Sequence, residues 1–308
     1  MNWELFWDLT VSGVTLGSVY ALIALGYSMV YGILKLLNFA HGDVYMIGAF
    51  VGYFTLRALG GPVSPNAAAW IVVVLMFVVA MVACGALGVV IERFAYRPLR
   101  EAPRIAPLIS ALGVSFFLQN TALLVFGASF RDYDTFHLIG AKTYNYGNVF
   151  LSLPQILTIL AALGLMVALT LLVSHTKIGK AMRATSFDRE AASMMGIDVD
   201  RVIASTFFIG SALAGAAGVM FGLVFGQIYH FMGFLAGLKG FTAAVIGGIG
   251  SIPGAMLGGL LVGLSESYAT GYLPQGSTFR DLYVFALLIA IILIRPSGIF
   301  GKADVKKV

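Results

Sequence analysis

The chain has 308 residues, of which 59% are hydrophobic and only 11% are charged. Soluble domains carry about a quarter charged residues, so the composition excludes an ordinary soluble enzyme or binding module. The formal net charge of +5 indicates no nucleic-acid partner, because the basic residues lie in short loops beside apolar stretches, where they report orientation in a membrane. Cys84, the single cysteine, lies inside an apolar run, and we expect it to be a small buried packing residue.

Apolar stretches long enough to cross a hydrocarbon core of roughly 30 Å recur along the chain. They predict an all-α, glycine-rich, polytopic transmembrane bundle in contact with membrane lipid, with about 8–10 spans and a single domain over residues 1–308. The first stretch follows two acids and no base, which is unlike a cleaved signal peptide. In chain order the predicted spans are 9–31, 43–59, 67–91, 105–126, 153–174, 202–228, two short segments within 232–270, and 280–295.

Basic residues gather in two loops and in the tail. These three regions contain Arg93, Arg97, Arg100 and Arg104; Lys177, Lys180, Arg183, Arg189 and Arg201; and Lys302, Lys306 and Lys307. By the positive-inside rule, we predict that all three regions are cytoplasmic. The loops around 60–66, 129–148 and 271–280 then face outward, and the nine predicted crossings leave the N-terminus outside.

Small residues recur at helical spacing. The clearest stripe repeats every fourth position and consists of Gly210, Ala214, Gly218, Gly222 and Gly226. Such stripes let helix backbones approach closely where lipid supplies no hydrophobic drive; we expect static packing, with rocking of the smooth faces as the open alternative. Two polar, glycine-broken segments, 32–43 and 239–254, interrupt apolar runs in the two halves of the chain. Their pairing suggests an internal repeat around a central pathway.

Polar residues and glycines within these interruptions, or inside apolar runs, are the candidates for lining that pathway. They are Asn38, His41, Asp43, Lys239, Gly247, Gly248, Gly250 and Glu266. A charge at the bilayer centre costs roughly 2.5–3.5 kcal/mol, so a charged candidate should have a partner or face water. Two interpretations stay open for Asp43, a helix cap near the interface and a pathway residue. Lys239 either snorkels to an interface or points into the pathway, and the pair Gln119-Asn120 is expected to hydrogen-bond a neighbouring helix.

Residues 175–201 form a strongly charged segment between two predicted spans. We expect it to be helical from about Gly179 and to lie on the cytoplasmic side. Its Glu-Ala-Ala-x-x-x-Gly pattern begins at Glu190; the two alanines permit close approach of another backbone, and Gly196 permits a sharp turn. The segment is therefore a candidate docking loop for a partner, and a solvated interfacial helix is the alternative. The residues proposed to carry the docking are Gly179, Arg183, Asp188, Glu190, Ala191, Ala192 and Gly196.

The sequence lacks recognisable motifs for nucleotide binding, metal binding or catalysis. Its only Gly-Lys pairs, 179–180 and 301–302, lack the following Ser or Thr and the earlier glycine of a phosphate-binding loop. The four histidines are scattered without ligand spacing. We therefore expect no catalytic residue, no metal site and no cofactor in this chain, which fits a transport subunit better than an enzyme.

Four segments carry a family resemblance. They are 13–22 (GVTLGSVYAL), 38–46 (NFAHGDVYM), 91–99 (IERFAYRPL) and 241–251 (FTAAVIGGIGS). Together they resemble the branched-chain amino-acid ABC transporter permeases of the LivH type, and the likeness runs nearly end to end. The NFAHG stretch and the short N-terminus are more similar to this H-type than to the companion M-type permease.

The resemblance implies a subunit of an importer in the bacterial inner membrane. Its partners would be a second permease of the M-type, two ATP-hydrolysing subunits that hold ATP and Mg, and a periplasmic substrate-binding protein. The 175–201 loop would be the coupling element that docks in the ATPase, although the I-x-L-P that commonly follows the motif is missing. Branched-chain amino acids (Leu, Ile, Val) are the expected substrates. Permeases for urea, amides or other amino acids look similar, and an ion-coupled transporter or a membrane anchor without transport are further alternatives.

Overall fold

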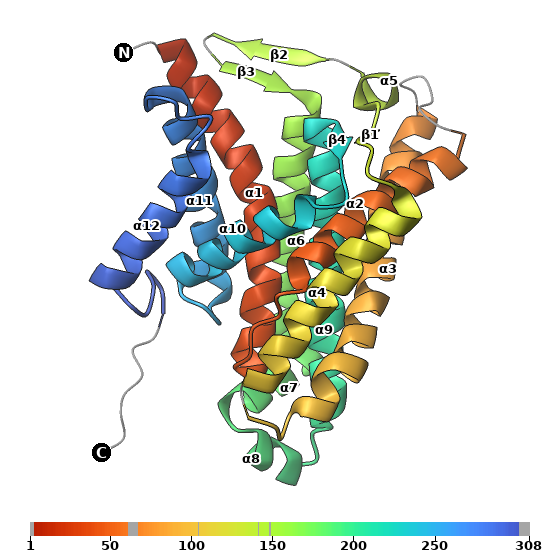
Figure 1. Ribbon diagram of the computed structural model, residues 1–308, viewed down its shortest axis with the longest axis vertical. Coiled ribbons are helices and arrows are strands. Elements are labelled where there is room, and N and C mark those ends of the chain that lie inside the picture. The colour runs from red at the N-terminus through yellow and green to blue at the C-terminus, as the bar shows by residue number, and fades with distance from the viewer. Residues whose placement is uncertain (1–2, 61–66, 104, 141, 148, 302–308) are drawn as a thin grey trace.

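The structure is a computed structural model that describes residues 3–60, 67–103, 105–140, 142–147 and 149–301. Helices dominate this part of the chain (Figure 1). The longer ones are α1 (Trp3–Leu34), α2 (His41–Ala58), α3 (Ala67–Ile91), α4 (Ile105–Phe126), α6 (Leu153–His175), α9 (Val199–Phe225), α10 (Met232–Gly247), α11 (Ile252–Tyr272) and α12 (Arg280–Ile294). The shorter ones are a π-helix (Glu92–Tyr96), a 3-10 helix (Arg97–Leu99), α5 (Thr135–Ile139), α7 (Lys177–Phe187) and α8 (Arg189–Met194).

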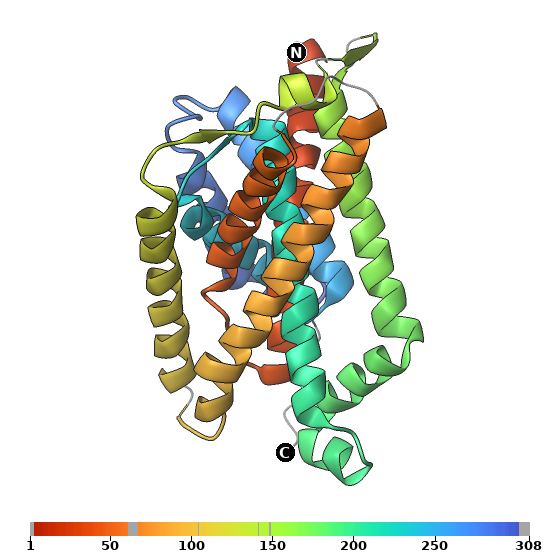
Figure 2. The ribbon, with the colours of Figure 1, turned by 90° about the vertical axis from the view of Figure 1, so that its right-hand side faces the viewer.

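This architecture confirms the predicted polytopic helical bundle. Five helical segments of the described chain are long and apolar enough to cross a membrane: α1, α3 with its extension to Leu99, α4, α6 and α9. Of the two short segments predicted within 232–270, the second is longer than expected, because α11 has 21 residues. Figure 2 shows α4 and α6 on opposite sides of the bundle, with α3 and α9 between them.

Helices α1–α4 form one set and α9–α12 form a second set. Each helix of the second set runs in the direction opposite to that of its counterpart in the first (Figure 1). Their contacts correspond: α1 packs on α11 as α9 packs on α3, and α1 contacts α10 as α9 contacts α2. In addition, α1 packs against α9 and α2 against α10. This is the arrangement of an inverted-topology repeat, a common plan for transport proteins, and it gives a concrete form to the repeat that the sequence only suggested.

Glycines allow the helices of the two sets to touch through their backbones. A Cβ atom placed on Gly48 of α2 would lie 2.5 Å from Cα of Gly215 on α9, and one on Gly17 of α1 would lie 2.8 Å from Cα of Leu260 on α11. Gly218, from the predicted stripe, meets the carbonyl oxygen of Tyr45 in the same way. The close packing predicted from the small residues is confirmed, while the rocking of these faces stays a hypothesis.

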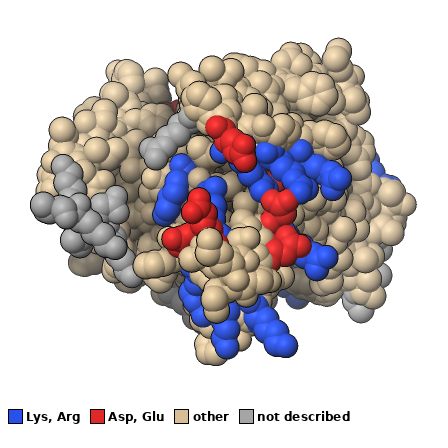
Figure 3. Space-filling view, turned by 90° about the horizontal axis from the view of Figure 1, so that it is seen from below, with Lys and Arg blue, Asp and Glu red and all other residues tan. Residues whose placement is uncertain are grey.

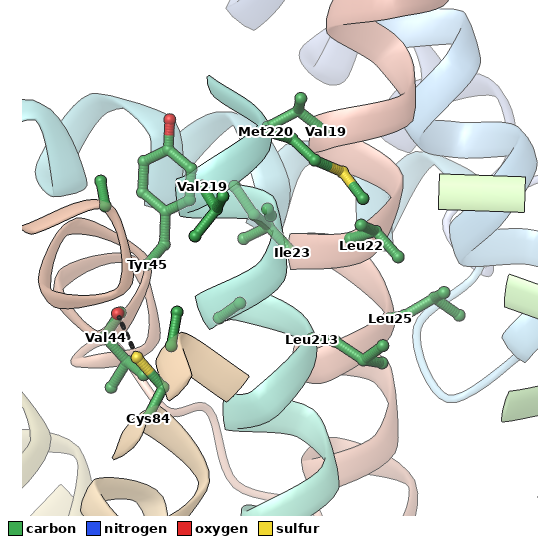
Figure 4. Close-up of a cluster of buried hydrophobic side chains, with 14 of the residues drawn as sticks. Val19, Leu22, Ile23, Leu25, Val44, Tyr45, Cys84, Leu213, Val219 and Met220 are labelled. Atoms are coloured by element: carbon green, nitrogen blue, oxygen red, sulfur yellow. Dashed lines mark hydrogen bonds between the residues drawn. The ribbon is translucent and has the colours of Figure 1, made fainter. Parts of the chain in front are cut away.

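The core lies where α1, α2, α3 and α9 meet (Figure 4). Buried side chains from α1 and α9 interdigitate there, including Val19, Leu22, Ile23, Leu25, Leu213, Val219 and Met220. Cys84 of α3 is fully buried, and its thiol donates to the carbonyl oxygen of Val44 at 3.4 Å. The predicted role of Cys84 as a small packing residue is therefore confirmed.

The two ends of the bundle differ in chemistry. The end that holds the N-terminus of α1 carries α5 and two small sheets, in which β1 (Arg131–Asp132) pairs with β4 (Gln227–Ile228) and β2 (Thr143–Tyr146) with β3 (Val149–Ser152). The opposite end carries both predicted basic loops, and Figure 3 shows Lys and Arg side chains gathered there. Arg104 and the tail lysines 302, 306 and 307 lie outside the described residues.

Candidate functional site

The 175–201 segment forms two short helices rather than one continuous helix. Asp188 separates them, and its side chain accepts a hydrogen bond from the backbone N–H of Ala191 at 3.0 Å, which caps α8. Gly196 ends α8 with a φ of 82°; its N–H bonds the oxygen of Ser193, and the next N–H bonds the oxygen of Ala192. This pair of bonds is a Schellman motif, which favours glycine at that position. The predicted sharp turn at Gly196 is therefore present.

We call this pair of helices (residues 177–196) the docking element. Its most exposed side chains are apolar. Phe187, Met194 and Met195 are 95%, 86% and 83% exposed. Glu190 and Ala191 are also exposed, whereas Ala192 is buried against the rest of the chain. The two alanines therefore differ, since only Ala191 can meet the backbone of another protein.

Three side-chain and backbone contacts hold the docking element to the bundle. Arg189 of α8 donates from Nε and Nη2 to the carbonyl oxygen of Ile33, at 3.2 and 2.7 Å. Arg183 of α7 donates to the carbonyl oxygen of Val173 at the end of α6. A Cβ atom on Gly179 would lie 2.3 Å from that same oxygen, so the start of α7 needs glycine to pack there. These contacts join the docking element to α1 and α6.

Asp43 lies in the first turn of α2, which begins partway along the bundle (Figure 1). It is 1% exposed, and its carboxylate accepts hydrogen bonds from Ser115 at 2.5 Å and from Gln119 at 3.0 Å, both on α4. The cap interpretation of Asp43 is wrong, because Ala40 is the N-cap of α2 and no side chain caps it. The expected bond to a neighbouring helix is confirmed for Gln119, whereas Asn120 donates to the carbonyl oxygen of Phe116 in its own helix at 2.8 Å.

Asn38 lies in the connection that leads into α2 and His41 is the first residue of that helix; both are buried. The Tyr96 hydroxyl is 3.2 Å from Oδ1 of Asn38, to which it donates. The imidazole of His41 packs edge-on against Tyr27, with 4.9 Å between the ring centroids. Nδ2 of Asn38 and Nε2 of His41 have no hydrogen-bond partner among the described residues. These are buried polar atoms that could meet water or a passing solute.

Lys239 and Glu266 are brought together in a second buried cluster. The Lys239 ammonium is 2.6 Å from Glu266 and 2.7 Å from Asp281, and the Tyr20 hydroxyl donates to Glu266 at 3.0 Å. Arg280 lies 3.9 Å from Glu266. Four helices, α1, α10, α11 and α12, meet through these side chains. Each buried charge therefore has an opposite charge beside it, as the cost of burial requires.

The three candidate glycines lie in and around the turn between α10 and α11. Gly247 packs against the backbone of Gly254, while Gly248 and Gly250 have φ angles of 103° and 90°, which favour glycine. The segment after α12 closes over this turn: the N–H groups of Ile299 and Phe300 donate to the carbonyl oxygens of residues 246 and 247, each at 2.9 Å. This segment thereby satisfies carbonyl groups that the end of α10 leaves open.

A cavity of about 990 Å³ opens between the docking element and this turn. Its walls come from the second half of α1, the end of α6, α7, the α10–α11 turn and residues 296–301. Of the candidate pathway residues, only Gly250 lies in this wall. The candidates thus fall into three places: the start of α2, the Lys239–Glu266 cluster and the α10–α11 turn.

Several residues of these clusters were not singled out from the sequence. Ser115, Tyr96, Tyr20 and Asp281 are partners of predicted residues, but none carries a signal that distinguishes it from neighbouring polar side chains in an apolar run. Among the described residues, no group of three His, Cys, Asp or Glu side chains is placed to hold a metal ion.

A glycine-packed bundle of inverted halves, with buried paired charges and an exposed element at its basic end, has the architecture of a membrane transport subunit. The chain belongs to the family described as the branched-chain amino acid transport system permease component, whose model matches residues 9–294. It is a multi-pass membrane protein of the LivH type in that family.

Comparison with individual relatives distinguishes the two types of permease. The chain is 45% identical over 302 residues to the high-affinity branched-chain amino acid transport system permease protein LivH of Escherichia coli (strain K12), covering 96% of each chain. It is 26% identical to the LivM permease of Salmonella typhimurium, covering 94% of this chain and 69% of that one. The predicted similarity to the H-type over the M-type is confirmed.

A solved structure shares the fold at low sequence identity. It is described as PsaBC from Streptococcus pneumoniae in complex with Fab, with a TM-score of 0.50 and 13% identity, covering 95% of this chain and 92% of that chain. This likeness shows the fold alone.

Proposed function

We propose that this chain is a permease subunit of an ATP-binding-cassette importer that carries leucine, isoleucine and valine across the bacterial inner membrane. The observation that carries the proposal is the 45% identity to LivH over 96% of both chains. One relative is named for another solute: the fructose import permease protein FrcC of Rhizobium meliloti is 28% identical to this chain, over 57% of it. The identity to LivH favours branched-chain amino acids over urea, amides or other amino acids.

The subunit performs no chemistry in this proposal. ATP and Mg are bound and ATP is hydrolysed in two separate partner subunits, an M-type permease completes the membrane part, and a periplasmic binding protein delivers the substrate. The apolar tips of the docking element support a protein partner at the basic end, because exposed Phe and Met side chains suit an adaptable interface. Glu190 and Ala191 would face the ATPase, and Arg189 would pass its movement to α1.

The substrate would cross between this chain and the second permease, near the start of α2 and the α10–α11 turn. The unpartnered Asn38 and His41 nitrogens support the first of these regions. Helix ends and free backbone groups suit a zwitterion at such places. Lys239 and Glu266 are proposed to fix the positions of the helices around the pathway rather than to contact the substrate, since each is paired with an opposite charge.

The test is uptake by reconstituted vesicles. The complex of this chain with an M-type permease, the ATPases and the binding protein should accumulate labelled leucine when ATP is enclosed, and unlabelled isoleucine or valine should compete. Urea and acetamide should not compete. Uphill uptake by this chain alone, or uptake that survives without ATP and collapses with the ion gradient, would refute the proposal.

A further inference from the structure

The cavity between the docking element and the α10–α11 turn changes character along its depth. One wall is a stripe of α1 that runs from Met29 through Gly32 to Lys35. Met29 and Leu34 are five positions apart on α1, a rise of about 7.5 Å at 1.5 Å per residue, and Lys35 follows the end of the helix. Met29 is buried, whereas Lys35 is exposed at the basic end of the bundle. Ser28, at the deep end, is the polar exception on this wall.

The facing walls combine apolar side chains with serines 186, 251 and 297, and the exposed Phe187 and Phe300 belong to the same lining. Val173 of α6, Met182 of α7 and Ile252 of α11 line the cavity with apolar side chains. Arg183 is exposed on α7 and also lines the cavity. Apolar side chains therefore make up much of the wall, and both cations of the lining, Lys35 and Arg183, are exposed.

The charges around this cavity all have one sign. Lys35 and Arg183 are its charged lining residues, and no Asp or Glu is among the described residues that line it. The N-terminus of α11, capped by Ser251, also opens into the cavity and adds a partial positive charge from the helix dipole. The cavity thus offers several donors to an anion and no carboxylate to an ammonium group.

We propose that this cavity binds an anionic phospholipid of the inner leaflet, with its phosphate between Lys35 and Arg183 and an acyl chain along the apolar wall of α1 and α6. Basic pockets between membrane helices on the cytoplasmic side bind acidic lipid headgroups, and the apolar depth suits a chain that inorganic phosphate does not have. A zwitterionic amino acid fits less well, because nothing charged in the lining would receive its ammonium group. The proposal is independent of the transported substrate.

The position of the cavity gives the lipid a structural role. Arg183 and Met182 belong to the docking element, whereas Ser251 and Ile252 belong to the start of α11. A lipid there would fill the space between the element that meets a partner and the turn that is closed by residues 298–301. The lipid, rather than a protein side chain, would then set the distance between these two parts.

The test is native mass spectrometry of the full chain, purified in neutral detergent after incubation with dioleoyl phosphatidylglycerol. We expect one retained phosphatidylglycerol, and about five-fold weaker retention for each cation removed in Lys35→Asn and Arg183→Gln. Asn suits position 35 because Lys35 has a φ of 56°, a left-handed value that Asn tolerates. Lys177→Gln with Lys180→Gln is the matched control, since both lysines are exposed on α7 and neither lines the cavity.

A variant that keeps the charges tests the apolar part: Ile252→Trp should fill the cavity and reduce retention while leaving the mouth intact. Dioleoyl phosphatidylcholine should be retained weakly, and millimolar inorganic phosphate should not displace phosphatidylglycerol. Equal retention of the two lipids, or unchanged retention in the Lys35→Asn/Arg183→Gln double variant, would overturn the proposal. So would displacement of phosphatidylglycerol by millimolar leucine, which would make the cavity a compartment for solute.

Discussion

Arg189 donates two hydrogen bonds to one carbonyl oxygen, that of Ile33, at 3.2 and 2.7 Å, although the two residues are 156 positions apart in the chain. Ile33 belongs to the last turn of α1, where carbonyl groups lack partners within the helix. The guanidinium therefore connects the docking element to the central helix of the bundle. Replacement of Arg189 should therefore reduce transport without preventing the binding of a partner.

We expect Arg189→Gln to keep the complex with the ATPase but to lower the uptake rate about ten-fold. The reason is the loss of a charge-assisted hydrogen bond, which contributes roughly 1.5–3 kcal/mol. Co-purification and vesicle uptake, measured on the same preparation, check this. Arg201→Gln is the control, because Arg201 is exposed and pairs only locally with Asp198 at 3.4 Å. Equal uptake by the two variants would show that the bond to Ile33 transmits nothing.

Glu190→Arg should abolish both uptake and association with the ATPase. Glu190 is exposed in the first turn of α8 and makes no ion pair among the described residues, so the reversal should leave the fold of this chain intact. Pull-down of the ATPase by the detergent-purified chain measures association. Lys177→Glu, a reversal at another exposed position of the docking element, should have a weaker effect. Normal uptake by the Glu190 variant would argue for a solvated loop without a partner.

Asp43 can be tested for charge and for hydrogen bonding separately. Asp43→Ala leaves the buried Ser115 hydroxyl without its acceptor and removes one of the two acceptors of Gln119, which should cost about 1–3 kcal/mol of stability. Asp43→Asn keeps an acceptor oxygen and should unfold close to the wild-type temperature. If transport is driven by ATP, the Asn variant should also retain uptake. Loss of uptake in a stably folded Asn variant would instead favour a coupling carboxylate, as in an ion-driven transporter.

The pair of Lys239 and Glu266 should show strong energetic coupling. Lys239→Met leaves the carboxylates of Glu266 and Asp281 close together without their shared cation, and removal of one buried partner costs about 3–5 kcal/mol. The double variant Lys239→Met/Glu266→Met should be more stable than Lys239→Met alone, because Asp281 keeps Arg280 nearby. Thermal unfolding of the four proteins of this cycle gives the coupling. Additive losses would mean that the two charges do not depend on each other.

Glycine contacts between α2 and α9 predict a contrast between two alanine substitutions. Gly48→Ala would place a Cβ atom 2.5 Å from Cα of Gly215, and such overpacking costs about 1–3 kcal/mol. Gly113→Ala on α4 meets no described heavy atom within 4 Å and should be neutral or slightly stabilising. Unfolding temperatures in the same detergent compare them. Similar temperatures for both variants would mean that the helices can separate at no cost.

Much of the fold could be predicted from the sequence, because membrane helices can be recognised by the length and apolar composition of their segments. The predicted span 105–126 matches α4 residue for residue, and 43–59 differs from α2 by two residues at its start and one at its end. The break at Asp188 was missed, although Thr185, Ser186, Phe187 and Asp188 are weaker helix formers than the alanines nearby and Asp is a preferred N-cap residue. Only the extended backbone of Asp188, with a φ of −154°, shows that the chain leaves the helix there.

The candidate site was predicted as single residues rather than as clusters. Asp43, Lys239 and Glu266 stand out because charge is costly in an apolar run. Their partners do not: Ser115 lies 72 positions from Asp43, and one sequence contains no information about which polar residues meet. Arg189 was predicted as a contributor of charge to a loop, and its contact with the Ile33 oxygen depends on tertiary packing alone.

Gly26 of α1 and Gly210 of α9 meet where the two inverted halves cross. A Cβ atom on Gly210 would lie 3.3 Å from Cα of Gly26, and one on Gly26 would lie 2.2 Å from the His41 ring. With no side chain on either glycine, there is no rotamer to change at the crossing. If the two halves rock, this backbone contact would restrict their separation more than their mutual angle, and the His41 imidazole against Gly26 would limit how closely the helices approach.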